Sequence, residues 1–201
     1  MSGYIIEIKN NILEIFKNKS TGYFVDIGAY DGLSISNTKF LEEIGWTGVC
    51  IEPHPNVFKR LVENRNCECI NCAVWHENTE VEFLSLTGYT EMLSGIKDSY
   101  DERHYNRILS ELRTYGGNQE LIKIKANKFE DIVKIKEIDF LSIDTEGSEL
   151  EILSRIDFNE FNIKVICIEN NFHEQKFIDF FVDRGYKLYN NINIDYFFIK
   201  N

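Results

Sequence analysis

Residues 23–32 read YFVDIGAYDG, and this stretch decides the fold. Its first half is short, apolar and partly β-branched, which is typical of a buried strand. Gly28 and Gly32 follow within a few residues, and glycine is the residue that tight turns most often require. The stretch therefore predicts a strand over residues 23–27 that enters a turn and then a helix.

The same alternation of strand and helix continues on both sides of this stretch. Before it, apolar residues recur every three to four positions and predict a helix over about residues 4–18. After it, apolar runs separated by helical patterns predict further strands, which lie at residues 48–52, 69–74, 139–144 and 165–169. The tail from residue 186 predicts two strands around a turn near residues 190–191. Together these elements predict an α/β fold, a doubly wound and mostly parallel sheet with one antiparallel strand near the C-terminus.

One segment interrupts the alternation. Residues 87–119 are rich in Gly, Tyr, Ser and charge, without a strong period over much of their length. A long irregular segment inside a compact domain is commonly a functional lid or binding loop. We therefore predict one domain over residues 1–201, with a substrate lid over about 87–119 and a helix over about 101–112 within it.

The composition excludes several classes of partner. The chain has 201 residues with 33 Asp and Glu against 22 Lys and Arg, a formal net charge of −11. An acidic chain lacks the basic face that coats nucleic-acid phosphates or docks on anionic lipid. No apolar run approaches the roughly 18 residues of a membrane span, and five cysteines fit reduced thiols. We expect a cytoplasmic protein with no nucleic-acid or membrane partner.

Polar residues gather where the predicted parallel strands end, and open α/β sheets bind their ligands at those ends. Glu52 follows the second strand, where a carboxylate can accept both hydroxyl protons of a ribose. Tyr30 stands where dinucleotide folds have the glycine that admits a pyrophosphate. Asp26, Gly28 and Gly32, together with Glu52, therefore indicate an adenosine-type ligand without a pyrophosphate, such as S-adenosylmethionine. A strand-to-helix turn would need a glycine even without a ligand, so Gly28 alone leaves both interpretations open.

Three motifs extend this pattern along the chain: VDIGAYDG at residues 25–32, IEP at 51–53 and IDTEGSE at 143–149. With them the sequence resembles the FkbM-type S-adenosylmethionine-dependent methyltransferases over roughly residues 23–171, and D-x-E-G-x-E is the most specific element. The resemblance implies a Rossmann-like class I methyltransferase fold and methyl transfer to oxygen. The donor-binding residues predicted in this way are Asp26, Gly28, Ala29, Tyr30, Gly32, Ser36, Asn37, Glu52, Pro53, Ala73 and Val74.

A second group of polar residues follows two other strands. Asp144 ends one predicted strand, while Glu169 and Asn170 end the next, so all three are expected at one crevice. Carboxylate and amide oxygens suit Mg²⁺ or Mn²⁺, and the arrangement is similar to that of cation-dependent catechol-type O-methyltransferases. The alternative is ordinary hydrogen bonding, with Asp144 ordering its own loop and Asn170 capping the next helix.

The predicted catalytic residues are Asp144, Glu146 and His173. Glu146 lies in a loop that faces the crevice, and His173 could act as a general base because histidine titrates near neutral pH. An exposed histidine near a helix start is an equally good interpretation of His173. Glu149 is expected to be structural, because an acid in the first turn of a helix favours the helix dipole.

The function that the resemblance implies is O-methylation of a sugar or glycan hydroxyl, with a deoxyhexose-type acceptor, and the acids around Asp144 add divalent-cation assistance to this expectation. We also weigh a role as one domain of a larger glycan-modifying protein. Two alternatives stay open. An NAD(P)-dependent oxidoreductase shares the sheet and the acid after the second strand, and a methyltransferase-like domain could serve for binding without catalysis.

Overall fold

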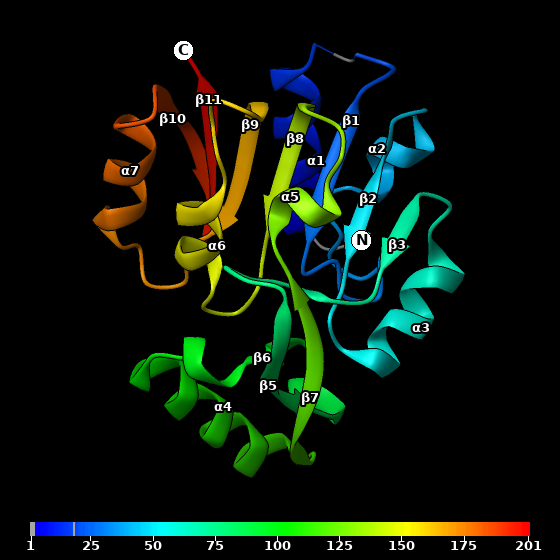
Figure 1. Cartoon of the computed structure of the whole chain (residues 1–201), viewed down its shortest axis with the longest axis vertical. Helices are drawn as coiled ribbons and strands as arrows, with labels where there is room; N and C mark the ends of the chain where they lie inside the picture. Colours follow the sequence, from blue (N-terminus) through cyan, green and yellow to red (C-terminus); the bar gives the residue numbers. More distant parts are fainter. Residues whose placement is uncertain (1–2, 18) are drawn as a thin grey trace.

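The computed structural model describes residues 3–17 and 19–201 and contains two sheets (Figure 1). The larger sheet has the strand order β10-β11-β9-β8-β1-β2-β3. Its strands are β1 (Tyr23–Ile27), β2 (Thr47–Ile51), β3 (Glu68–Ile70), β8 (Glu137–Ile143), β9 (Asn162–Glu169), β10 (Tyr186–Ile192) and β11 (Asp195–Lys200). β11 is antiparallel to both of its neighbours, and the other neighbouring strands are parallel. The predicted doubly wound sheet with one antiparallel strand is confirmed.

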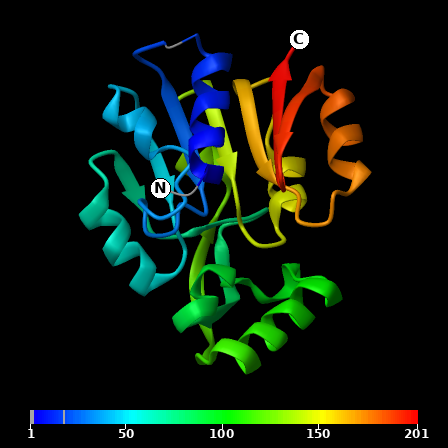
Figure 2. The same cartoon turned by 180° about the vertical axis from the view of Figure 1, so that it is seen from behind.

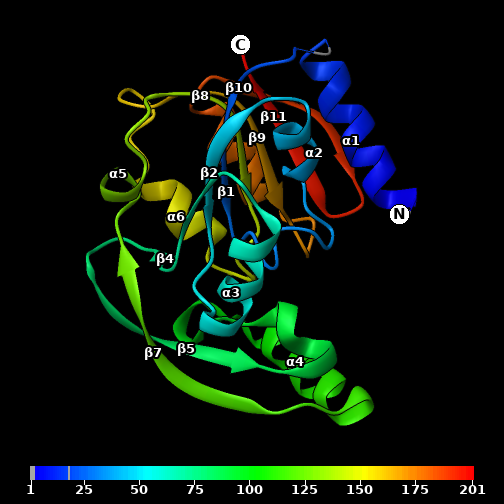
Figure 3. The ribbon, with the colours of Figure 1, turned by 90° about the vertical axis from the view of Figure 1, so that its right-hand side faces the viewer.

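The strands are apolar because the larger sheet is covered on both faces. Successive side chains of a strand point to opposite faces, so Phe24 packs on one side of β1 while Val25 and Ile27 pack on the other. Helices α1 (Gly3–Ile15), α2 (Lys39–Glu43) and α3 (Pro55–Asn64) contribute to the first of these cores. Helices α5 (Phe129–Ile132), α6 (Glu149–Arg155) and α7 (Gln175–Val182) contribute to the second. Figures 2 and 3 show the two layers of helices on either side of the sheet.

A smaller sheet lies beyond the carboxyl ends of the parallel strands (Figures 1 and 3). It has the order β4-β7-β5-β6, formed by β4 (Ala73–Val74), β5 (Thr79–Leu86), β6 (Gly95–Ile96) and β7 (Gln119–Asn127). The segment between β5 and β7 carries the short 3-10 helices η1 (Gly88–Leu93) and η2 (Lys97–Ser99) and the helix α4 (Glu102–Tyr115).

The segment expected to be irregular is therefore largely ordered. Leu93 of η1 and Ile108 of α4 form a small apolar cluster with Leu86 of β5, which gives this part of the chain a core of its own. The segment lies across the ends of the parallel strands, where a substrate lid would be placed. Whether it moves as a lid stays a prediction.

Three element boundaries differ from the sequence prediction. The expected strand over 69–74 is divided, because Ala73 and Val74 pair with β7 of the smaller sheet instead of continuing β3. The first helix ends at Ile15 rather than at residue 18, which lies outside the described residues. The closing turn follows Ile192, slightly later than expected. Within the described residues, no helix combines the length and the apolar character that crossing a membrane requires.

Candidate active site

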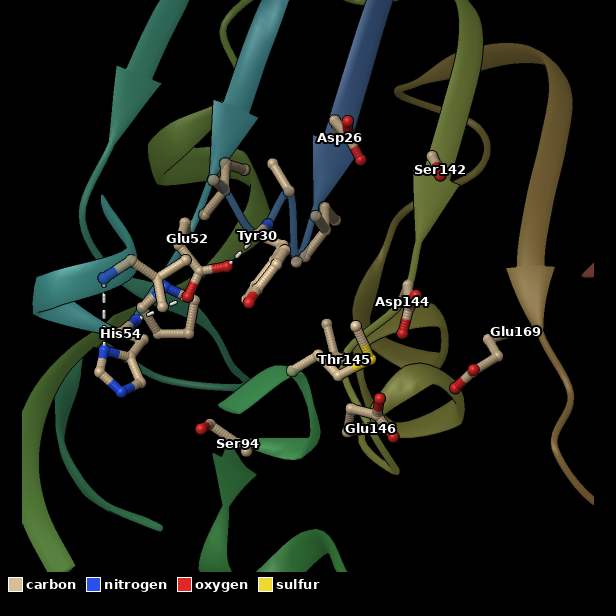
Figure 4. A pocket seen from close by; sticks show the side chains of 18 of the residues that line it. Asp26, Tyr30, Glu52, His54, Ser94, Ser142, Asp144, Thr145, Glu146 and Glu169 are labelled. Carbon is tan, nitrogen blue, oxygen red and sulfur yellow. Dashed lines mark hydrogen bonds between the residues drawn. The ribbon is translucent and has the colours of Figure 1, made fainter. Parts of the chain in front are cut away.

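A cavity of about 370 Å³ lies between the two sheets, within the range of roughly 300–1,000 Å³ that is typical of ligand pockets. It lies where the strand order changes direction, next to β1 and β8, which is the place where open α/β sheets bind their ligands. Figure 4 shows that its two ends differ: Glu52 and His54 stand at one end, and Asp144, Glu146 and Glu169 at the other.

The turn after β1 needs its glycines for packing. Gly28 has φ +80°, and a Cβ there would lie 1.6 Å from the backbone oxygen of Asp144. The protein itself therefore occupies the space that the missing Cβ leaves open. Gly32 has φ +73°, and a Cβ there would lie 2.6 Å from Leu61 of α3. Gly32, predicted to bind the donor, packs against α3 and does not line the cavity.

Glu52 is held rigidly at its end of the cavity. One carboxylate oxygen accepts the N–H of Tyr30 at 3.0 Å, and the other accepts the N–H of His54 at 2.7 Å. The side chain is buried, and burial raises the pKa of Glu52 to about 8. Each oxygen keeps a further lone pair, so the carboxylate can still accept hydrogen bonds from a ligand in the cavity.

The other predicted donor-binding residues lie around this end and along the cavity. Asp26 is buried, and its charge is partly offset within the protein, because the hydroxyl of Thr38 donates to it and the guanidinium of Arg65 lies 3.9 Å away. Asn37 donates to the hydroxyl of Ser142 at 3.3 Å. Apart from Gly32, every predicted donor-binding residue lines the cavity: Asp26, Gly28, Ala29, Tyr30, Ser36, Asn37, Glu52, Pro53, Ala73 and Val74.

Three carboxylates converge at the opposite end. Asp144, Glu146 and Glu169 each offer an oxygen within 4.8 Å of the other two. Asp144 is open to the cavity, whereas protein atoms surround its other sides. This burial, followed by the charge of Glu149, raises the pKa of Asp144 to about 7. Burial, and next the charge of Asp144, raise the pKa values of Glu146 and Glu169 well above their usual range.

The loop after β8 is ordered by Glu149. One of its carboxylate oxygens accepts the N–H of Thr145 at 2.9 Å, the hydroxyl of Thr145 at 3.0 Å and the N–H of Gly147 at 3.0 Å. These bonds fix the backbone on both sides of Glu146. Glu149 therefore orders this loop without lining the cavity, whereas Asp144 and Glu146 line it.

Asn170 and His173 do not join the carboxylates. The side-chain oxygen of Asn170 accepts the N–H of Glu174 at 2.9 Å, and its amide donates to the carbonyl of Glu174 at 3.2 Å, so it holds the start of α7. His173 is exposed, with Nδ1 at 3.0 Å from the hydroxyl of Tyr196. Neither residue lines the cavity, and Glu146 takes the place next to Asp144 and Glu169 that was expected for Asn170.

The smaller sheet contributes residues that the sequence pattern did not identify. Arg107 of α4 is the one Lys or Arg among the described residues that line the cavity. His104, also of α4, has Nε2 at 3.2 Å from a carboxylate oxygen of Glu146, and burial lowers the pKa of His104 to about 4. The hydroxyl of Tyr30 donates to Glu91 of η1 at 2.8 Å. These contacts depend on how the smaller sheet docks, which no local motif encodes.

Two solved structures have a distant likeness to this chain. A TehB-like SAM-dependent methyltransferase from Corynebacterium glutamicum is 10% identical with a TM-score of 0.48, over 98% of this chain and 88% of that chain. A human methyltransferase 10 domain containing protein is 10% identical with a TM-score of 0.45, over 99% of this chain and 82% of that one. Likeness at this level carries no argument about function. The curated proteins gave no match to the sequence.

The family is shown by the sequence itself. Residues 26–188 match the family model of the methyltransferase FkbM domain, which is most of the chain. The matched residues include the turn after β1, Glu52 and the three carboxylates. The strand order and the single reversed strand give the Rossmann-like fold of class I methyltransferases. The chain therefore belongs to the FkbM methyltransferase family.

Proposed function

We propose that the chain is an S-adenosylmethionine-dependent O-methyltransferase that acts on a hydroxyl of a sugar or glycan, with a deoxyhexose-type acceptor. Membership of the FkbM family supplies the methyl-transfer reaction. Binding of S-adenosylmethionine is supported above all by Glu52. Two backbone N–H groups fix its carboxylate at the end of β2, and its remaining lone pairs can accept hydrogen bonds from a ribose.

The cavity fits this donor better than a dinucleotide. Apolar residues such as Val74, Phe83 and Ile96 line the cavity, and an adenine ring can pack against them. The one Lys or Arg among the described lining residues is Arg107, which the carboxylate end already engages electrostatically. Near Glu52 the guanidinium of Arg60 lies over the ring of Tyr30 but is already paired with Glu91, so a pyrophosphate would have to compete with that carboxylate. S-adenosylmethionine supplies the methyl group when bound.

The carboxylate end has the chemistry to activate a hydroxyl. A sugar hydroxyl is a weak nucleophile until its proton is removed, and a general base works best when its pKa lies near the working pH. Asp144 meets this condition, with a pKa raised to about 7 and a side chain open to the cavity. In this proposal Asp144 takes the proton and Glu146 orients the hydroxyl beside it.

Divalent-cation assistance is the second part of the proposal. The oxygens of Asp144, Glu146 and Glu169 lie within 4.8 Å of one another, and carboxylate oxygens are the ligands that Mg²⁺ and Mn²⁺ prefer. A cation held by these acids would lower the pKa of a coordinated hydroxyl. It would also lower the pKa of Asp144, so in this second form of the proposal Asp144 is a ligand of the cation instead of the base. Treatment with EDTA should then abolish turnover, and adding back Mg²⁺ or Mn²⁺ should restore it. Full turnover in chelator would remove the cation from the mechanism.

Calorimetry and a transfer assay test the proposal directly. We expect S-adenosylmethionine and S-adenosylhomocysteine to bind, and a labelled methyl group to reach methyl glycosides of rhamnose or fucose. Binding of NADH instead would favour the oxidoreductase alternative, and donor binding without transfer to any sugar would favour a non-catalytic domain. The cytoplasmic location, the absence of nucleic-acid and membrane partners, and the place in a larger glycan-modifying protein stay predictions.

A further inference from the structure

His104 occupies a buried and tightly held position in the first turn of α4. The residue is 2% exposed, and its backbone N–H donates to the N-cap carboxylate of Asp101 at 2.8 Å. The ring of Tyr100 packs against the imidazole, with 5.1 Å between centroids and 39° between planes. The hydroxyl of Tyr100 donates in turn to the carbonyl of Leu93 at 2.7 Å. The imidazole is therefore held in one place by its surroundings.

The imidazole faces one of the three carboxylates. Nε2 of His104 lies 3.2 Å from Oε2 of Glu146. Both atoms are buried, and over residues 3–17 and 19–201 neither one has an aligned hydrogen-bond partner. Buried polar atoms in proteins nearly always have a partner, so two orphaned atoms facing each other require an explanation. Their separation is within hydrogen-bond range, and only the alignment is lacking.

The backbone of Glu146 adopts a strained conformation. Its φ is +59°, in the left-handed region that non-glycine residues seldom adopt. At the next residue, Gly147, a Cβ would lie 2.9 Å from the carbonyl oxygen of Ser99 in η2. The loop after β8 is thus pressed against the smaller sheet. Such strained positions persist only where the surrounding structure enforces them, and they concentrate at functional sites.

We infer that His104 is a positioning residue: its Nε2–H donates to Glu146 in the working enzyme and holds that carboxylate toward the acceptor hydroxyl. The inference rests on the proposed function, which places the acceptor beside Glu146. It also gives the smaller sheet a part in the reaction, because the side chain of Glu146 meets His104 only while α4 is docked, even though Glu149 holds the backbone around Glu146. Arg107, one turn further along α4, lines the same end of the cavity.

Two substitutions separate hydrogen bonding from packing. His104→Phe keeps a ring of similar size and removes the donor, whereas His104→Gln removes the ring and keeps an N–H near the position of Nε2. If His104 positions Glu146, His104→Phe should lower kcat on the order of 10- to 100-fold and leave the KM for the donor within about twofold. His104→Gln should keep most of the activity. The reverse ranking would mean that the imidazole serves only to fill space.

A second measurement decides the matter without turnover. The 13C chemical shift of the Glu146 side-chain carboxyl, assigned in labelled protein with Glu146→Gln, reports the hydrogen bonding of that carboxyl group. We expect this shift to move in His104→Phe and to keep its wild-type value in His104→Gln. Asn106→Gln, an exposed change on the same helix, is the matched control. An identical Glu146 carboxyl shift in all variants overturns the inference, whereas a wild-type protein that binds no donor overturns the proposed function instead.

Discussion

The two ends of the cavity satisfy their carboxylates in opposite ways. Glu52 accepts hydrogen bonds from two backbone N–H groups, and both donors lie close to the strands that carry the site. Asp144, Glu146 and Glu169 instead face one another, and Arg107 is the lining cation that acts on them. The carboxylate of Glu52 has fixed hydrogen-bond partners before any ligand binds. The three acids at the other end lie close together, which is electrostatically unfavourable when they are charged.

This difference teaches how one cavity can both hold and transform a ligand. A carboxylate with fixed partners binds with little reorganisation, which suits the part of the donor that does not react. Three carboxylates within reach of one another raise each other's pKa values in addition to the effect of burial, and such clusters occur at catalytic sites because they exchange protons near neutral pH. Burial also raises the pKa of Glu52, so the two ends differ in their hydrogen-bond partners and in the clustering of acids, not in the direction of the pKa shift. The comparison therefore assigns binding to the Glu52 end and chemistry to the Asp144 end, and substitutions at each end should have separable effects.

The largest effect is expected from Asp144→Asn. The amide cannot accept the proton of a sugar hydroxyl, so kcat should fall by about 10²- to 10⁴-fold. Donor affinity should change by less than about threefold, because Glu52 and its two backbone donors are untouched. Steady-state kinetics and calorimetry measure the two quantities separately. Asp183→Asn, at an exposed site after α7, should change neither. A loss confined to donor binding would contradict the assignment.

Glu52→Gln should show the converse behaviour. Above about pH 8, where Glu52 is charged, the amide can accept fewer hydrogen bonds than the carboxylate and has no charge, and losing hydrogen bonds to a charged group costs about 1.5–3 kcal/mol. Donor affinity should therefore fall by roughly 10- to 100-fold by calorimetry, while kcat at saturating donor changes less. Glu68→Gln removes the same charge at an exposed position of β3 and should leave affinity unchanged. Equal losses in both variants would point to net charge instead of a site.

The stability of the protein without ligand should fall as pH rises. The folded-state pKa values of Glu52 and Asp144 are raised to about 8 and about 7, above the roughly 4 of an unfolded carboxyl group. The folded state therefore holds protons that the unfolded state releases, and the free energy of unfolding decreases between about pH 4 and pH 8. Urea titrations across this range measure the slope. Glu52→Gln should flatten it, and an unchanged slope would contradict the raised pKa of Glu52.

The same contrast explains which parts of the site could be predicted from the sequence. The Glu52 end comes from one stretch of chain, in which a strand, a glycine turn and a second strand follow in order. Local patterning predicts Tyr30 and Glu52 at the ligand, and both residues line the cavity. Gly32 was assigned to the ligand because sequence cannot show that Leu61 of α3 fills the space beside it.

The carboxylate end was only partly predictable. The ends of β8 and β9 brought Asp144 and Glu169 to one crevice as expected. The side chain of Asn170 does not join this crevice, because it forms hydrogen bonds with the backbone N–H and carbonyl of Glu174. His104 arrives on α4, whose docking depends on the pairing of β5 with β7 and of β4 with β7, and those partners are distant in sequence. Non-local strand pairing of this kind leaves no signal in a short window of residues.

The smallest effect is expected where the smaller sheet meets the Glu52 end. Tyr30→Phe removes the hydrogen bond from the tyrosine hydroxyl to Glu91. Glu91 keeps its ion pair with Arg60, so no buried charge is left without a partner. Both side chains are only half-buried, so water replaces part of the lost bond. The free energy of unfolding should therefore fall by only about 0.5–1.5 kcal/mol, below the roughly 1.5–3 kcal/mol of a buried hydrogen bond to a charged group. Urea denaturation measures this change.

Tyr30→Phe also tests whether donor binding depends on the hydrogen bond between Tyr30 and Glu91. The N–H of Tyr30, which orients Glu52, belongs to the backbone and survives the substitution. Donor affinity should therefore stay within about twofold of the wild type. Tyr189→Phe, which removes an exposed hydroxyl at 3.3 Å from Glu14, is the control for losing one such bond. A tenfold loss of donor affinity in Tyr30→Phe alone would show that Glu52 depends on the smaller sheet, and the two ends of the cavity would no longer be independent.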